Sequence, residues 1–457
     1  MYKTTRRLSQ KAEQQYTLHA CLAYEDKSEM STMKESDLIN TTCPTIEEAR
    51  KEMANLLEAR EPNYSLPQPL YNDPHMFRVD MEEIFQKEWL FVGMTSEIPT
   101  KGDYFTVEIG QNPVLVVRDD EGNVQAFHNT CRHRGSKVCL EHRGKVANLI
   151  CPYHKWAYDL KGNLLFAGTE MGDAFDMKKH GLKKAHTKVG GGFIFICLAK
   201  EAPQGDDFDE YLKTMDEYME PYDVENTKLA VESNMYEKAN WKLVIENNRE
   251  CYHCHGGNHP ELLNTLQEWD DTNDPRAPQA FLDQYARQSA EWEAEGIPHE
   301  RRDFGHHRNR IVRMPLLEGK KVMTLDGEHG CKKMLGRIKN PYLGSMRILH
   351  LPNSWNHMQS DHFIVFRVLP ISAQESIVTT KWFVHKDAVE GVDYDVERLR
   401  LVWDATNDQD RVLGEDNQSG INSLAYEPGP YSESFEFGVI NFLDWYSTTV
   451  QENLKKK

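Results

Sequence analysis

The chain has 457 residues, of which 39% are hydrophobic and 28% charged, a composition typical of globular proteins with two or three domains at this length. A net charge of −18 excludes the broad basic surface that binding to nucleic acid or to anionic lipid requires. No run of 18 apolar residues is present, so the sequence predicts no membrane-spanning segment.

The N-terminus is basic but lacks the apolar core of a signal peptide, and the nine cysteines are an odd number spread along the chain. Both features predict a cytoplasmic protein whose cysteines are reduced or bind metal. A transit peptide is the alternative, because Arg6 and Arg7 precede few acidic residues.

The first part of the chain is polar and mixed in charge, and we expect a poorly ordered extension over 1–44. Helices that pack on the C-terminal domain are expected over 45–87. Thr45 and Glu48 have the spacing of a capping box, and an apolar stripe of helical period follows them. The first helix is therefore predicted to begin directly after Thr45.

From residue 88 the pattern changes to short apolar runs separated by turns. The runs expected to form strands are 114–117, 124–128, 156–160, 164–166 and 193–198. The first two flank the turn sequence Asp-Asp-Glu-Gly-Asn, which is typical of a β-hairpin. The sequence therefore predicts a small all-β domain over 88–200.

Residues 201–457 combine helical and strand patterns. Helical spacing is found over 237–255, and a last amphipathic helix is expected over 396–418. The runs expected to form consecutive strands of one antiparallel sheet are 345–351, 362–369 and 377–385. The predicted fold class is α+β, with an all-β domain followed by an antiparallel sheet with helices.

Two Cys–His pairs occur in the β-rich region: Cys131-x-His133 and, after seventeen residues, Cys151-x2-His154. Two hairpin loops that each offer one thiolate and one imidazole can hold a [2Fe–2S] cluster, with thiolates on one iron and imidazoles on the other. A zinc site is the alternative, although this spacing is unusual for zinc. Cys139 has no partner at a telling spacing and is interpreted as a structural thiol.

The segment from Cys131 to Lys155 is basic in an otherwise acidic chain, with six Lys or Arg and one acid. One interpretation is charge support for an anionic cluster. The other is a docking face for an acidic electron donor.

A second group of metal-binding residue types lies near residue 250. Glu250 and His253 are three residues apart and would share one face of a helix. Gly256 and Gly257 can end that helix and turn the chain back, which would place His259 beside His253. A carboxylate from elsewhere would complete a 2-His-1-carboxylate site, which leaves positions open on a ferrous ion.

The preferred carboxylate is Asp410, which lies in the sequence Asn-Asp-Gln-Asp on the last predicted helix. Asp404 and Asp408 are alternatives on spacing alone. For each of them, a solvated helix face is the competing interpretation.

A zinc site formed by Cys251, Cys254 and the histidines is an alternative use of the same segment. Thiolates are poorly suited to a site that needs open positions, so this alternative is not preferred. His255 lies two residues from His253, on the opposite face of a helix, and is the least expected ligand.

The two sites together resemble the large (alpha) subunits of Rieske non-haem iron oxygenases, in particular those that act on quaternary ammonium compounds. The resemblance covers about 45–450. The matching segments are RECYHC…HPELLNTL, NRIVRMPLL, SMRILHLP, TTKWFVHKDAVEGVDYDV and VWDATNDQDR. It implies an all-β Rieske [2Fe–2S] domain over 88–200 and a helix-grip catalytic domain, an antiparallel sheet with helices, over 201–457.

The resemblance also implies roles for individual residues. The implied cluster ligands are Cys131, His133, Cys151 and His154, and the implied iron ligands are His253, His259 and Asp410. Glu250 matches an acidic bridge that passes an electron from His154 of a neighbouring subunit. Many members have Asp there, and Glu is found in those that act on quaternary ammonium compounds. Five residues separate the iron histidines where the family usually has four, which leaves His255 open as a ligand.

The implied protein is the oxygenase component of a homotrimeric monooxygenase. It would take electrons from NAD(P)H through a flavin and iron–sulfur reductase and, with O2, hydroxylate an N-methyl group of glycine betaine. Dimethylglycine and formaldehyde would be released. The alternatives are another quaternary ammonium substrate (proline betaine, carnitine or choline) and, less favoured, aromatic-ring dioxygenation. Trp355, Phe363 and Phe366 would either contribute to an aromatic cage for the cation or pack in the core.

Overall fold

The computed structural model describes residues 44–203, 205–267, 269, 272–274 and 276–456. The extension predicted over 1–44 therefore lies almost entirely outside the described residues. The helix α2 (Ile46–Glu58) begins after Thr45, and the predicted capping box with Glu48 is confirmed. The other short helices of this region are α3 (Pro69–Asn72), α4 (Pro74–Asp80) and the π-turn η1 (Met81–Phe85).

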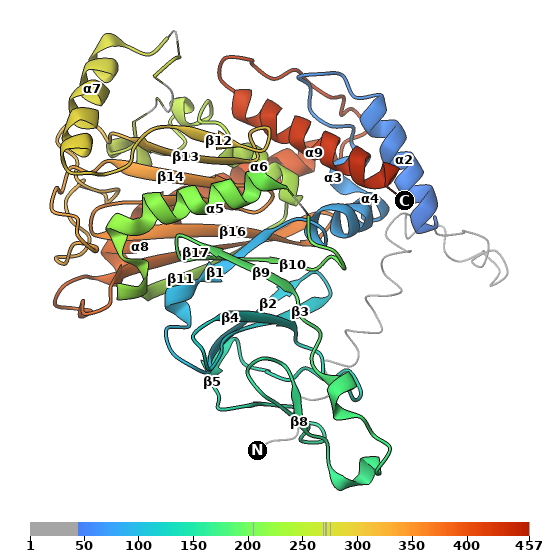
Figure 1. Ribbon diagram of the computed structural model, residues 1–457. Coiled ribbons are helices and arrows are strands. Elements are labelled where there is room, and N and C mark those ends of the chain that lie inside the picture. The colour runs from blue at the N-terminus through green and yellow to red at the C-terminus, as the bar shows by residue number, and fades with distance from the viewer. Residues whose placement is uncertain (1–43, 204, 268, 270–271, 275, 457) are drawn as a thin grey trace, which may run out of the picture.

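A small lobe of two antiparallel sheets follows, and Figure 1 shows it below the rest of the molecule. The strands of its four-stranded sheet are β4 (Val124–His128), β3 (Asn112–Arg118), β2 (Asp103–Ile109) and β5 (Arg143–Lys145), in that order. Those of its three-stranded sheet are β6 (Leu149–Ile150), β7 (Ala157–Tyr158) and β8 (Leu164–Phe166). The predicted hairpin is confirmed as β3 and β4, whereas the strand expected over 156–160 is reduced to β7.

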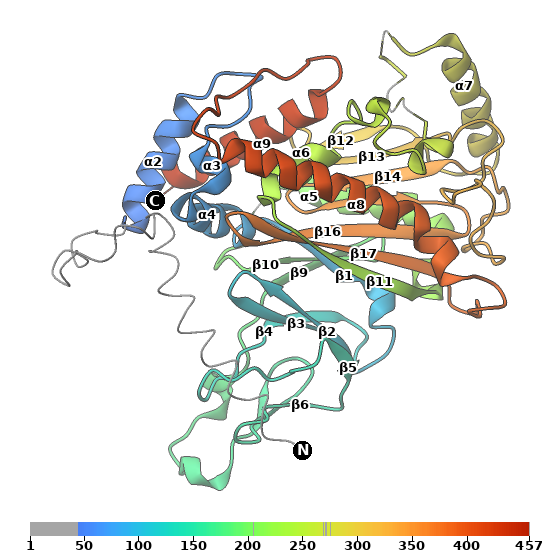
Figure 2. The same ribbon diagram turned by 180° about the vertical axis from the view of Figure 1, so that it is seen from behind.

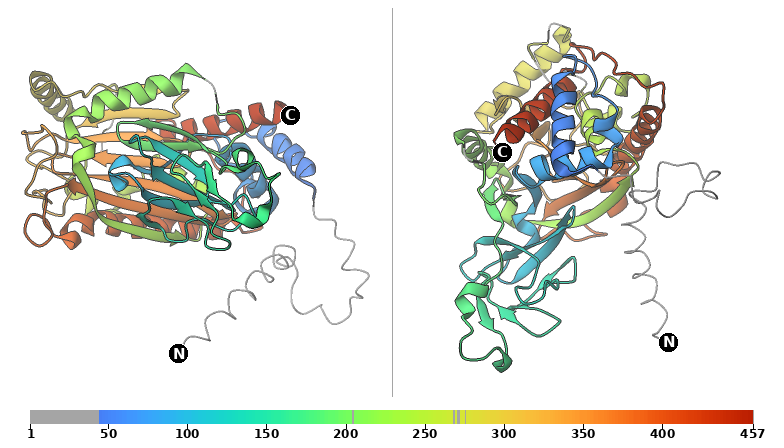
Figure 3. Two further views of the ribbon diagram at one scale, coloured as in Figure 1. Left: turned by 60° about the horizontal axis from the view of Figure 1, so that its bottom comes forward. Right: turned by 90° about the vertical axis from the view of Figure 1, so that its right-hand side faces the viewer.

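A third small sheet joins this lobe to the rest of the chain. It has the order β1 (Leu90–Met94), β10 (Phe193–Cys197) and β9 (His186–Gly190). All of β1 and β10 is buried, and β10 confirms the strand predicted over 193–198. The views in Figure 3 show how the lobe projects from the large sheet described next.

The large sheet has seven antiparallel strands, of which six form a meander, while the first strand in the sequence pairs with the last. Their order is β11 (Thr227–Glu237), β17 (Glu375–His385), β16 (His362–Ser372), β15 (Ser354–Met358), β14 (Ser345–His350), β13 (Asn309–Met314) and β12 (Arg302–Phe304). Strands β14, β16 and β17 confirm three predicted runs. They are not consecutive, because β15 pairs between β14 and β16.

Both faces of this sheet are covered, which explains its nearly continuous apolar strands. Ile364 and Phe366 pack into one core, and Phe363 and Val365 into another on the opposite face. Figure 2 shows α6, α8 and α9 across one face, and Figure 1 shows α5 across the other. The helices concerned are α5 (Asp206–Met219), α6 (Trp241–Asn248), α8 (Val396–Ile421) and α9 (Phe437–Lys455), while α7 (Gln279–Ala294) lies at the edge.

Two helix predictions need correction. The helix expected over 237–255 is only α6, because Glu237 still belongs to β11 and Asn240 caps the helix through its side chain. The helix expected over 396–418 is confirmed as α8, but it is not the last one. Helix α9 was missed because it is rich in aromatic and β-branched residues, which have weak helix propensity.

Candidate metal centres

The first candidate centre lies in two loops of the small lobe. Cys131 and His133 follow β4, and Cys151 and His154 follow β6. The two imidazoles meet at their Nδ1 atoms, which are 3.1 Å apart. Both cysteines are free and buried, whereas both histidines are exposed.

The two loops share one backbone design. In each, the residue four positions after the cysteine has a positive φ, +78° at Gly135 and +62° at Lys155. The N–H of that residue donates to the carbonyl of the cysteine, at 3.0 and 3.1 Å. Each loop therefore turns back tightly on its cysteine.

The surroundings of the thiols suit a buried metal cluster. Burial raises the pKa of Cys131, and the neighbouring Cys151 raises it further, so both disfavour the Cys131 thiolate. A cluster iron would neutralise the charge of a thiolate there. The Tyr158 hydroxyl lies 3.3 Å from the Cys131 sulfur and accepts from the N–H of Arg132. Cys139 is a separate, buried free thiol whose pKa burial raises to about 12.

The second candidate centre is formed by three side chains from distant segments. His253 and His259 come from the loop after α6, and Asp410 comes from the middle of α8. The Nε2 atoms of the two imidazoles are 2.9 Å apart. The Asp410 Oδ1 lies 3.0 Å from Nε2 of His259 and 3.4 Å from Nε2 of His253.

Hydrogen bonds define which nitrogen of each imidazole carries the proton. Nδ1 of His253 contacts the Glu250 carboxylate, and Nδ1 of His259 lies 2.8 Å from the side-chain oxygen of Gln409. Both partners accept, so each ring carries its proton on Nδ1 and presents the lone pair of Nε2. Three electron-pair donors, the two Nε2 atoms and Oδ1 of Asp410, therefore converge on one point. This arrangement is repulsive without a cation and fits a divalent metal ion.

The electrostatics of the site agree with this interpretation. Burial disfavours charge on His253, but the carboxylates of Asp410 and Glu250 outweigh it and raise its pKa to about 9. Without a metal ion, a proton on Nε2 would therefore be the cation that this site holds. The pKa of Asp410 is lowered by the same imidazoles in spite of its burial. Glu237 is buried close by, and its pKa is raised to about 8 by burial and by the charge of Asp410. The site therefore carries excess negative potential, which favours a bound cation.

The other acids proposed from spacing are engaged elsewhere. Asp404 pairs with Arg400 and Asp408 with Arg411, both along the surface of α8. The side chain of His255 lies outside the part of the chain that the structure describes.

The zinc alternative at Cys251 and Cys254 is contradicted, because the two form a disulfide. Their sulfurs are then not thiolates and cannot bind zinc in that role. The expectation that all cysteines are reduced or bind metal is wrong for this pair. The loop after α6 brings their Cα atoms to 5.0 Å, within the range of a disulfide.

The helical geometry expected for Glu250 and His253 is also wrong, although the two side chains do meet. Helix α6 ends at Asn248, and the Glu250 carboxylate then accepts from the N–H groups of Tyr252 and His253. The Glu250 carboxylate therefore stabilises this turn and also orients the imidazole of His253. Gly257, with φ of +84°, reverses the chain before His259, as expected for a glycine there.

Comparison with known proteins agrees with both centres. Residues 88–170 match the Rieske [2Fe-2S] domain family, and 216–452 match the catalytic domain of the ring hydroxylating alpha subunit family. The chain is 65% identical to the glycine betaine monooxygenase oxygenase subunit of Pseudomonas aeruginosa strain UCBPP-PA14, over 90% of this chain and 94% of that protein. The chain belongs to the Rieske non-haem iron oxygenase alpha subunits.

Other relatives of this Rieske oxygenase agree. It is 58% identical to the protein of the same name from Chromohalobacter salexigens, over 89% of this chain and 90% of that one. A solved quaternary ammonium Rieske monooxygenase in complex with L-carnitine superposes with a TM-score of 0.63 at 19% identity. That superposition covers 87% of this chain and 99% of the other.

The predicted fold class is therefore confirmed: an all-β Rieske domain precedes an α+β catalytic domain of helix-grip type. The oxidoreductase uses a Rieske [2Fe–2S] cluster and a mononuclear iron. None of the helices within the described residues is both long and apolar enough to cross a membrane.

The sequence analysis did not find two residues that the structure brings to the candidate iron site or to the cavity beside it. Gln409 directly precedes Asp410 and orients His259. Arg249 directly precedes Glu250 and lines the adjoining cavity. Both stand beside a predicted site residue, but their orientation depends on packing between segments far apart in the sequence.

Proposed function

We propose that this oxygenase hydroxylates an N-methyl group of glycine betaine, which then yields dimethylglycine and formaldehyde. The observation that carries the proposal is the 65% identity, over 90% of the chain, to an oxygenase subunit named for that substrate. The cavity beside the candidate iron site supports it, because it offers tryptophans for a cation and arginines for an anion.

The residues proposed to hold the cofactors are those that the geometry brings together. Cys131, His133, Cys151 and His154 would bind the cluster, and His253, His259 and Asp410 would bind ferrous iron. When bound, the cluster supplies electrons and the iron supplies the open coordination positions needed to use O2. Gln409 and Glu250 keep the two iron-site imidazoles in the tautomer that presents Nε2.

The overall reaction balances with two electrons from NAD(P)H and one O2. One oxygen atom enters a C–H bond of the N-methyl group, and the other leaves as water. The resulting N-hydroxymethyl group loses its hydroxyl proton, its C–N bond breaks, and the electron pair stays on nitrogen. Dimethylglycine and formaldehyde are the products.

We further propose that the protein acts as a head-to-tail homotrimer in the cytoplasm, with the Rieske domain over 88–200 and the catalytic domain over 201–457. A flavin and iron–sulfur reductase would deliver the electrons. His154 is exposed on the small lobe, which makes it accessible to a neighbouring subunit. Glu250 would then bridge the neighbour's His154 to its own His253, with which it already shares a hydrogen bond.

A single-turnover experiment tests the proposal. The protein is loaded anaerobically with ferrous iron, its cluster is reduced, and glycine betaine and O2 are added. Formaldehyde should form in step with cluster oxidation. Cluster oxidation without formaldehyde would reject glycine betaine, and the same assay with proline betaine, carnitine and choline would then identify the substrate. A cis-diol from an aromatic substrate would reject N-demethylation altogether.

A further inference from the structure

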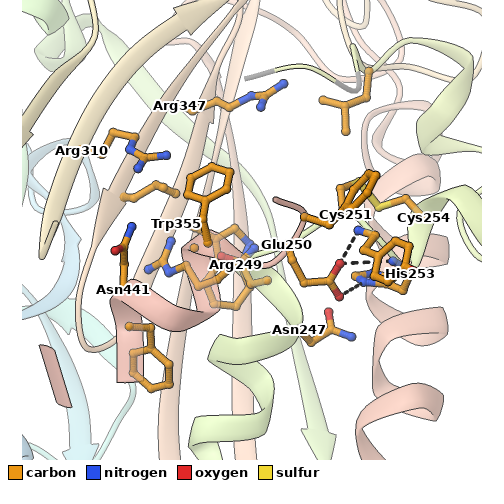
Figure 4. A pocket seen from close by; sticks show the side chains of 18 of the residues that line it. Asn247, Arg249, Glu250, Cys251, His253, Cys254, Arg310, Arg347, Trp355 and Asn441 are labelled. Atoms are coloured by element: carbon orange, nitrogen blue, oxygen red, sulfur yellow. Dashed lines mark hydrogen bonds and ion pairs between the residues drawn. A yellow bond between two sulfur atoms is a disulfide. The ribbon is translucent and has the colours of Figure 1, made fainter. Parts of the chain in front are cut away.

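A cavity of about 290 Å³ adjoins the candidate iron site. It is walled by the loop after α6 and by parts of β13, β14, β15, α8 and α9. Its arginines are Arg249, Arg276, Arg308, Arg310 and Arg347. In Figure 4, Arg310 and Trp355 lie to one side of the cavity and His253 to the other, with Arg249 and Glu250 between them. The cavity therefore has Arg310 on the side away from His253, and Arg249 between the two sides.

Four of these arginines have partners. Arg276 pairs with Asp274 at 2.6 Å. Arg308 pairs with Glu88 at 2.7 Å, and Arg310 pairs with Asp303 at 2.9 Å. Arg347 donates to the Gln267 carbonyl at 3.3 Å. Their charges are therefore at least partly compensated within the protein.

Arg249 differs from them. Both terminal nitrogens of its guanidinium are buried and have no acceptor in the described part of the chain. Burial and the nearby charge of Arg310 lower its pKa to about 9. A buried guanidinium without an anion is costly, and a carboxylate in the cavity would compensate it.

The backbone holds Arg249 in place before any ligand binds. Its N–H donates to the carbonyls of Ile245 and Glu246, which closes α6. Its own carbonyl packs against Gly438 of α9 so closely that a Cβ there would lie 2.2 Å from the oxygen. The main chain of Arg249 is therefore fixed before binding, which reduces the entropy cost of placing its side chain.

The cavity also has aromatic walls. Trp403 lines the cavity from α8, seven residues before Asp410, and two helical turns place both on one face. Trp355 lines it from β15 and stacks on Phe366 with ring centroids 5.2 Å apart. Tryptophan faces are the best aromatic partners for a quaternary ammonium group.

We propose that Arg249 binds the carboxylate of the zwitterionic substrate and thereby directs its N-methyl groups toward His253, His259 and Asp410. The inference rests on the proposed function and names Arg249 as the residue that selects substrates with a carboxylate. A substrate without a carboxylate, such as choline, leaves the buried guanidinium of Arg249 unpaired, so the site discriminates against it.

Calorimetric titration of the iron-loaded, full-length protein with glycine betaine and with choline tests the inference. Arg249→Gln should weaken glycine betaine binding about 10- to 100-fold, the loss expected for a charge-assisted hydrogen bond. Choline affinity should stay unchanged. Arg249→Lys keeps the charge and should restore part of the glycine betaine affinity. Arg287→Gln is the matched control, since Arg287 is exposed on α7 and pairs with Glu318.

Unchanged glycine betaine affinity in Arg249→Gln, or an equal loss for both ligands, would overturn the inference. So would a wild-type protein that does not prefer glycine betaine to choline. The proposed function fails separately, if wild-type protein binds glycine betaine but releases no formaldehyde in the single-turnover assay.

Discussion

At the scale of single residues, iron binding at the candidate site depends on the carboxylate of Asp410. Asp410→Ala should remove one of three converging donors and lower iron content and turnover by at least about 100-fold, while the cluster spectrum stays intact. Metal analysis and the visible spectrum of the same sample measure both effects. Asp408→Ala is the control, because Asp408 is exposed and pairs with Arg411. Loss of iron in the control instead would reassign the ligand.

Glu250 combines two tasks, because it orients His253 and is the proposed electron bridge. Glu250→Gln keeps the size of the side chain but loses its charge, and we expect cluster oxidation during single turnover to slow about 10- to 100-fold at saturating iron. Glu250→Asp keeps the charge and should retain most of the rate. Equal rates for wild-type protein and Glu250→Gln would show that the carboxylate is not needed for electron transfer.

At the scale of elements, α9 matters because it fixes the end of α6. Gly438→Ala forces a Cβ against the Arg249 carbonyl, so the two segments must separate. We expect the free energy of unfolding to fall by about 1–3 kcal/mol, measured by urea denaturation. Gly420→Ala in α8 meets open space and should be neutral or stabilising. A Gly438→Ala variant as stable as wild-type protein would show that α9 does not restrain Arg249.

At the scale of the whole molecule, an ion-pair network joins the small lobe to the large sheet. Glu232 of β11 contacts Arg143 and His142 of the lobe and lies 3.8 Å from Lys381 of β17. Although burial alone would raise its pKa, these partners and Asn234 lower it well below the ordinary value of a glutamate. The stabilisation is therefore present at neutral pH and is lost as pH falls below about 4.3, the ordinary pKa.

Glu232→Gln should accordingly lower Tm at pH 7 and flatten its decline between about pH 5 and pH 3. Scanning calorimetry across this range measures both effects. A variant whose Tm declines with acid as steeply as that of wild-type protein would show that other carboxylates dominate.

The basic segment around the cluster is less available for docking than its charge suggests. Lys137 pairs with Glu108, Arg143 with Glu232 and Lys145 with Asp103. Lys155 is exposed beside His154 and is the better candidate for contact with an acidic reductase.

Lys155→Glu should slow reduction of the cluster by the reductase and weaken the dependence of that rate on salt. Stopped-flow absorbance measures the rate of cluster reduction at several salt concentrations. Lys161→Glu is the control, because Lys161 already pairs with Glu121. A rate that does not depend on salt in wild-type protein would exclude electrostatic docking.

Short-range sequence patterns were sufficient to predict the two Cys–His loops of the Rieske domain, the hairpin of β3 and β4, and the capped start of α2. Each depends on contacts within a few residues, so the chemistry of the side chains and the turns specifies it locally. The family, and with it the two cofactors, followed from the same local motifs.

Packing between distant segments determines the choice of the third iron ligand and the environment of Arg249. Asp404, Asp408 and Asp410 have similar spacing, and only the packing of α8 against the loop after α6 turns Asp410 toward the histidines. The same packing buries the guanidinium of Arg249, whose terminal nitrogens find no acceptor among the described residues, and places α9 against the Arg249 carbonyl. Such contacts join segments more than a hundred residues apart, and their geometry depends on the whole core, which no local pattern encodes.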